Sequence, residues 1–150
     1  MPTTVCRACG GAGSPLRWAC PCCVRATVER LDGIRDHAVA LCAAGPSHEG
    51  RSDPTPPVPA RLRSALEEGL RDPDPAVVAL SVLAVLHRVA TYVRHHRGDP
   101  GAWRCTIVGE TGYLRANAEW CAHQLWGHEF VEVVHELHVR IGSRSASAVR

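Results

Sequence analysis

The chain has 150 residues, 45% of them hydrophobic, and a formal net charge of +2 at pH 7. This length predicts one domain, or a small module joined to one modest domain. The small net charge does not favour a strongly basic nucleic-acid-binding surface. The longest apolar stretch, residues 76–86, is shorter than the roughly 20 residues that span a membrane, so no membrane contact is expected.

Two Cys-x-x-Cys pairs open the chain, Cys6 with Cys9 and Cys20 with Cys23. This spacing is typical of a zinc ribbon, in which four thiolates surround one tetrahedral zinc ion. We predict one structural Zn²⁺, because a closed shell of four thiolates leaves no position for water or substrate. Cys22 is an alternative fourth ligand, and Cys23 is preferred because it keeps the two-residue gap.

The start of the chain also bears on compartment and charge. No signal peptide precedes the first cysteine pair, so we expect a cytoplasmic protein, and there such pairs favour metal over disulfides. Residues 1–25 contain Arg7, Arg17 and Arg25 and no acidic residue. These three cations are the candidates for nucleic-acid contact, although four zinc-bound thiolates would add about −2 to the ribbon.

The predicted fold is mainly α, with a small four-cysteine zinc ribbon (residues 1–24) followed by a four- to five-helix bundle. Apolar residues at three- and four-residue steps predict a connecting helix over residues 25–44. Residues 45–59 contain five prolines and predict a linker. The bundle is expected over residues 60–142, and residues 143–150 are expected to form a flexible tail.

Within the bundle, the apolar spacing predicts four helices, over residues 59–70, 75–97, 111–125 and 128–141. Asp74 suits the N-cap of the second of these, and Pro75 suits its first position. That helix is apolar on nearly every side in its first half, which predicts a central, buried position. Residues 106–108 are expected to be extended, and Gly142 is expected to end the last helix.

Other polar groups give weaker patterns. His128, Glu132 and His135 share one face of the last predicted helix, opposite its apolar face, which predicts a solvated polar surface. Cys121 and His123 are two residues apart on a helix, so they point in different directions and cannot form a nucleophile and its base. No catalytic residue is therefore predicted. Trp126, at a predicted turn, is a candidate contact for a protein partner.

The last two helices could in principle form a helix-turn-helix that reads DNA. The second of them would present Glu129, Glu132 and Glu136 against Arg140. Phosphates would repel that surface, so DNA reading by these helices is not expected.

Taken together, these segments resemble a group of proteins from actinobacteria and their phages. The resemblance rests on the cysteine pairs running into the Leu-rich helix of Cys20–Leu41, the PTPPVP segment of Pro54–Pro59, and the helices between Leu114 and Leu137 that carry Trp120, Trp126 and Phe130. Longer members look as though they add a further cysteine-containing segment and a helix-turn-helix. This sequence ends at Arg150 without that segment. The resemblance implies a regulatory role in association with DNA.

The sequence thus predicts a non-enzymatic, zinc-binding regulatory or adaptor protein that acts through protein contacts. The alternative is a nucleic-acid-associated regulator that contacts DNA through the basic ribbon.

Overall fold

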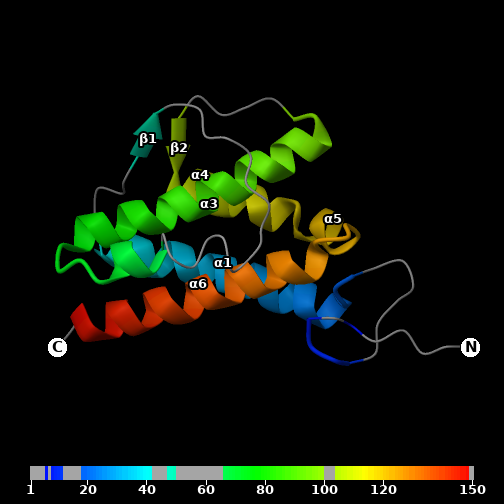
Figure 1. Ribbon diagram of the computed structural model, residues 1–150, viewed down its shortest axis with the longest axis horizontal. Helices are drawn as coiled ribbons and strands as arrows, with labels where there is room; N and C mark the ends of the chain where they lie inside the picture. Colours follow the sequence, from blue (N-terminus) through cyan, green and yellow to red (C-terminus); the bar gives the residue numbers. More distant parts are fainter. Residues whose placement is uncertain are drawn as a thin grey trace, which may run out of the picture.

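The computed structural model describes residue 6 and residues 8–11, 18–41, 47–49, 66–99 and 104–148. The described part is mainly α, as predicted (Figure 1), and four cysteines gather near its N-terminal end. Its helices are α1 (Pro21–Leu41), α3 (Pro75–Arg97), α4 (Ile107–Ala116), α5 (Ala118–Ala122) and α6 (Gly127–Ala148), and residues 66–70 are helical as well. Two short strands, β1 (Ser47–Glu49) and β2 (Arg104–Thr106), pair antiparallel with His48 opposite Cys105. Most of the predicted linker and the first part of the helix predicted over residues 59–70 lie outside the described residues.

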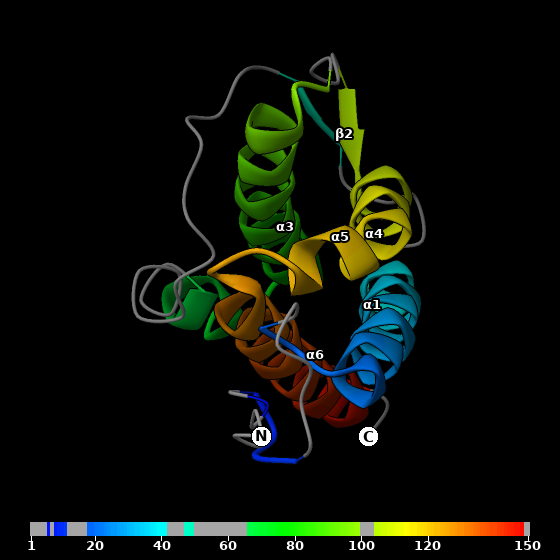
Figure 2. The same cartoon turned by 90° about the vertical axis from the view of Figure 1, so that its right-hand side faces the viewer.

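The helices enclose one core. α1 lies along α6 and also packs against α4 and α3, so the helix predicted as a connection is one wall of the bundle. It contributes Leu31, Ile34 and Ala38, which are fully buried. Figure 2 shows the short α5 between α3 on one side and α4 and α1 on the other. The β1–β2 pair lies beside α3, at the opposite end of the molecule from the start of α1 (Figure 1).

Helix α3 has the predicted bounds and the predicted cap. The Asp74 carboxylate accepts a hydrogen bond from the Ala76 backbone N–H at 2.9 Å, and Pro75 is the first helical residue. The helix ends at Gly98, whose φ of 72° is the left-handed conformation that glycine adopts at low cost. By length and composition α3 could cross a membrane, but 56% of its most apolar window is buried inside the molecule. A central core helix explains both observations.

The segment after β2 differs from the prediction in two places. Residues 107 and 108, expected to be extended, already belong to α4, because the Thr106 hydroxyl accepts a hydrogen bond from the Gly109 N–H at 3.0 Å and caps the helix there. The helix predicted over residues 111–125 is broken at Asn117 into α4 and α5. The side-chain amide of Asn117 donates a hydrogen bond to the Tyr113 backbone carbonyl at 2.8 Å. Local side-chain bonds of this kind compete with continuation of the helix.

The end of α6 is also different, since Gly142 does not stop the helix, which continues to Ala148. An interior glycine costs a helix about 1 kcal/mol relative to alanine, which packing can offset. A Cβ at Gly142 would lie 3.6 Å from Nε2 of His37 on α1, and a Cβ at Gly33 on α1 would lie only 2.6 Å from Nε2 of His138 on α6. Gly33 thus provides the space for the His138 ring, whereas a Cβ at Gly142 would only make an ordinary van der Waals contact with His37. The two contacts have the same offset in residue number, so α1 and α6 run parallel.

This histidine contact makes folding stability depend on pH. Burial, followed by the charges of His37, Arg30 and His135, lowers the pKa of His138. The unfolded chain, with a histidine pKa near 6.5, then binds a proton where the folded chain does not. We expect stability to be complete above about pH 6.5 and to fall as the pH drops through that value toward the folded pKa. Urea unfolding of the wild type and His138→Gln at a series of pH values tests this. The variant should lose less stability on acidification, and an equal loss in both proteins would contradict it.

A second structural prediction concerns the turn between α5 and α6. A Cβ at Gly127 would lie 2.7 Å from the Cys121 carbonyl oxygen and 3.0 Å from that of Ala122, both of which are backbone atoms. Gly127→Ala should therefore destabilise the fold by about 1–3 kcal/mol. Gly112→Ala is the matched control, because no atom lies within 4 Å of its added Cβ and α4 should gain about 0.5–1 kcal/mol. Chemical denaturation of both variants measures the difference, and equal stability would refute the packing argument.

A buried ion pair joins α3 to α4. Arg94 donates two hydrogen bonds to the Glu110 carboxylate, at 3.0 and 2.8 Å, and Nδ1 of His87 lies 3.5 Å from the same carboxylate. Glu110 is 1% exposed and Arg94 is 8% exposed. The Arg94 guanidinium also lies over the Tyr113 ring, 4.3 Å from its centroid. No sequence motif indicated this pair, which depends on two helices meeting.

Candidate metal centre

The first cysteine pair lies on a tight turn that its own backbone holds together. The Cys6 N–H donates to the Gly11 carbonyl and the Gly10 N–H donates to the Cys6 carbonyl, both at 2.8 Å. Gly10 has a φ of 74°, a conformation that disfavours other residues and explains the glycine after Cys9. We call the turn formed by Cys6 and residues 8–11 the knuckle. It aims both thiols toward the start of α1.

The second pair is positioned by α1 itself. Cys20 directly precedes the helix, and Cys23 lies in its first turn. The Trp18 and Ala19 backbone N–H groups both donate to the Ala122 carbonyl at the end of α5, at 2.7 and 3.3 Å. The cysteine cluster is thus attached to the bundle both through α1 and through α5.

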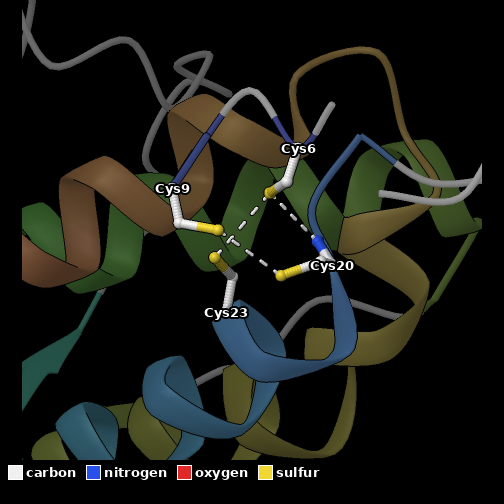
Figure 3. A group of neighbouring side chains, drawn as sticks. All are labelled: Cys6, Cys9, Cys20 and Cys23. Carbon is white, nitrogen blue, oxygen red and sulfur yellow. Dashed lines mark hydrogen bonds between the residues drawn. The ribbon is translucent and has the colours of Figure 1, made fainter. Parts of the chain in front are cut away.

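The four sulfur atoms of Cys6, Cys9, Cys20 and Cys23 lie within 4.8 Å of one another, as Figure 3 shows. The Cys6 and Cys23 sulfurs are 3.8 Å apart, and those of Cys9 and Cys20 are 3.6 Å apart. A disulfide would require about 2.05 Å. A zinc tetrathiolate with Zn–S bonds of about 2.3 Å has sulfur–sulfur edges of about 3.8 Å. The spacing therefore fits four ligands of one tetrahedral metal ion and does not fit disulfides.

Backbone donors support the thiolate form of the ligands. The Cys20 N–H donates to the Cys6 sulfur at 3.2 Å, and the Gly11 N–H donates to the Cys9 sulfur at 3.4 Å. Burial opposes ionisation of the Cys6 thiol, but the N–H groups of Cys20, Cys9 and Ala8 outweigh it and lower its pKa to about 6. Burial and the neighbouring thiols raise the pKa of Cys23. Metal binding must therefore displace a proton from the Cys23 thiol.

The structure also separates the two candidates for the fourth ligand. Cys23 is buried within the cluster, whereas Cys22 is exposed and is not among the four converging sulfurs. Successive residues on a helix point about 100° apart, so one first turn cannot aim both thiols at the same point. Cys121, which the sequence excluded as a nucleophile paired with His123, is fully buried, and burial raises its thiol pKa to about 12.

The remaining candidate residues are spread over the molecule. Arg25 is exposed on α1, whereas Arg7 and Arg17 lie outside the described residues. Trp126 is half-buried in an aromatic cluster, with its ring centroid 5.3 Å from that of Tyr92 and 5.9 Å from that of Trp120. Its neighbour Leu125 is 72% exposed.

The polar face of α6 only partly matches its prediction as a solvated surface. Glu132 and His135 are exposed, but His128 is half-buried, and its ring centroid is 6.4 Å from that of Trp18. The reason is that Trp18, two residues before Cys20, lies beside His128 near the start of α6. The sequence spacing placed these three residues on one face but could not show that the cysteine cluster adjoins it.

A comparison of the chain with protein-family models, with curated proteins and with solved structures found no match. The resemblance drawn from the sequence therefore stays a prediction.

Proposed function

We propose that this chain is a non-enzymatic, zinc-binding regulatory or adaptor protein that acts through protein contacts. The observation that carries the proposal is the convergence of four cysteine sulfurs at the spacing of a tetrahedral thiolate site. Four thiolates complete the coordination of zinc, so the ion has no position for a substrate and its role is structural.

The metal would fix the knuckle against the start of α1. Two ligands come from the knuckle and two from the start of α1, so one ion links a short irregular segment to a bundle helix. The knuckle is too small to bury a core of its own, and metal binding supplies the folding free energy in such cases. The exposed side chains of the knuckle, α1 and α6 then form a rigid face that a protein partner can recognise.

Partner capture from the native cell tests this proposal when it is made zinc-dependent. The wild type and Cys22→Ser should retain the same partner, whereas Cys9→Ser, which lacks one ligand, should lose it. Capture that is identical for all three proteins would contradict a metal-supported contact surface.

The alternative is nucleic-acid association through the ribbon, and it has its own test. Electrostatic binding to nucleic acid is strongest at low salt. The zinc-loaded protein is expected to shift neither duplex DNA nor single-stranded RNA under those conditions. A shift that disappears on Arg25→Ala would replace the protein-contact proposal with the nucleic-acid one.

A further inference from the structure

A cavity of about 330 Å³ lies between the knuckle, the first half of α1 and the first half of α6. Among the described residues, its polar lining is Cys9, Cys22, Cys23, Arg30, Glu132 and His135, and alanine and valine side chains supply its apolar lining. Two of the proposed zinc ligands, Cys9 and Cys23, therefore lie in the cavity wall. This volume is within the range of cavities that hold small ligands or single side chains of a partner.

The polar groups of the cavity are ordered along its length. Because Gly33 lies level with His138 on the parallel α6, the same offset places Arg30 level with His135. Glu132 lies nearly one turn nearer the cysteines than His135. Arg30 follows Cys23 by seven residues, about 10 Å along α1. The cysteines therefore lie in one half of the cavity, Arg30 and His135 lie in the other half, and Glu132 lies between them.

The cysteine half is negative when the metal is bound. Four thiolates and one divalent cation carry a charge of about −2. The Glu132 carboxylate adds to it, and among the described residues no hydrogen bond or ion pair engages that carboxylate. Among the described residues of the wall, Arg30 is the one permanent cation, and it lies in the other half. The half of the cavity that contains the cysteines therefore attracts a positively charged group.

We propose that the cavity binds a basic side chain, arginine or lysine, of a protein partner. Its charged end would donate to Glu132 and to the metal-bound sulfurs, and its aliphatic stem would lie along the apolar wall. Arg30 can then donate to a backbone carbonyl of the partner. The inference rests on the proposed function, because it needs both the bound metal and a protein partner.

An NMR titration of the zinc-loaded protein with two probes, N-acetyl-arginine amide and N-acetyl-lysine amide, tests the inference. At least one of them should shift the backbone amide signals of Cys9, Cys23 and Glu132 in a saturable way, with a Kd on the order of millimolar for so small a probe. Glu132→Gln should weaken binding about 10-fold, since a hydrogen bond to a charged group is lost. Glu29→Gln is the matched control, because Glu29 is exposed on α1 outside the cavity and its change alters the net charge equally. It should leave the affinity unchanged.

Three results would overturn the inference. The first is the absence of saturable shifts with both basic probes, and the second is equal binding of a basic probe by Glu132→Gln and the wild type. The third is tighter binding of N-acetyl-glutamate amide than of either basic probe, which would make Arg30 and His135 an anion site. Each of these leaves the proposed function standing if zinc-dependent partner capture succeeds. Failure of that capture, or a protein without zinc, removes the proposed function itself.

Discussion

Replacing Cys9 with serine is expected to weaken zinc binding by more than about 100-fold. Changes to residues that only hydrogen-bond to metal ligands typically cost about 10–100-fold in affinity, and Cys9 is itself a proposed ligand. The variant loses one of the four sulfurs that lie within 4.8 Å of one another. Without the metal, the knuckle depends on a few backbone hydrogen bonds, so we expect it to unfold. Helices α3, α4 and α6 should persist, because most of the buried side chains of their shared core come from these helices themselves. Metal analysis and the amide NMR signals of Gly10 and Gly11 measure both effects.

Cys22→Ser is the matched control for this prediction. It removes a thiol next to Cys23, but Cys22 is exposed and lies outside the converging sulfurs. The control protein should bind zinc as the wild type does. Loss of zinc from Cys22→Ser with retention in Cys23→Ser would instead identify Cys22 as the fourth ligand. Loss of the entire helical CD signal in Cys9→Ser would show that the knuckle and the bundle fold as one unit.

Arg94→Met is expected to destabilise the fold by about 3–5 kcal/mol, because it leaves the Glu110 carboxylate charged and without its guanidinium partner in the interior. Glu110 is 1% exposed, so water cannot replace the two hydrogen bonds that Arg94 donates. The variant also loses the contact of the guanidinium with the Tyr113 ring. Urea unfolding measures the change.

Two further variants test whether the stability loss comes from the buried ion pair or from the loss of any charged side chain. Arg97→Met removes a guanidinium that pairs with Asp99 at 3.3 Å, but both side chains are about one-third exposed, and the loss should stay below about 1 kcal/mol. The double variant Arg94→Met with Glu110→Leu should recover much of the stability, since no buried charge remains. A cost of Arg94→Met as small as that of Arg97→Met would contradict the buried-pair account.

The features that the sequence predicted correctly depend on residues close together in the chain. The cysteine spacing indicated the four sulfurs that converge, and Asp74 with Pro75 marked the start of α3. Both patterns are local, because a knuckle and a helix cap each need only a few consecutive residues.

The features that the sequence did not predict depend on contacts between distant segments. Glu110 is buried only because Arg94 on another helix neutralises it. Gly142 remains helical because α1 packs beside it, and β2 forms by pairing with a segment more than fifty residues earlier. The cavity next to the cysteines arises in the same way, from the parallel packing of α1 and α6.

The most direct test of the central claim is the metal content of the purified full-length protein, combined with its NMR spectrum before and after chelation. We expect one zinc ion per chain, and chelation should remove the amide signals of Cys6, Cys9, Gly10 and Gly11 while the α3 signals remain. A protein that binds no zinc, with signals of the knuckle that a chelator leaves unchanged, would contradict a structural zinc site formed by these four cysteines.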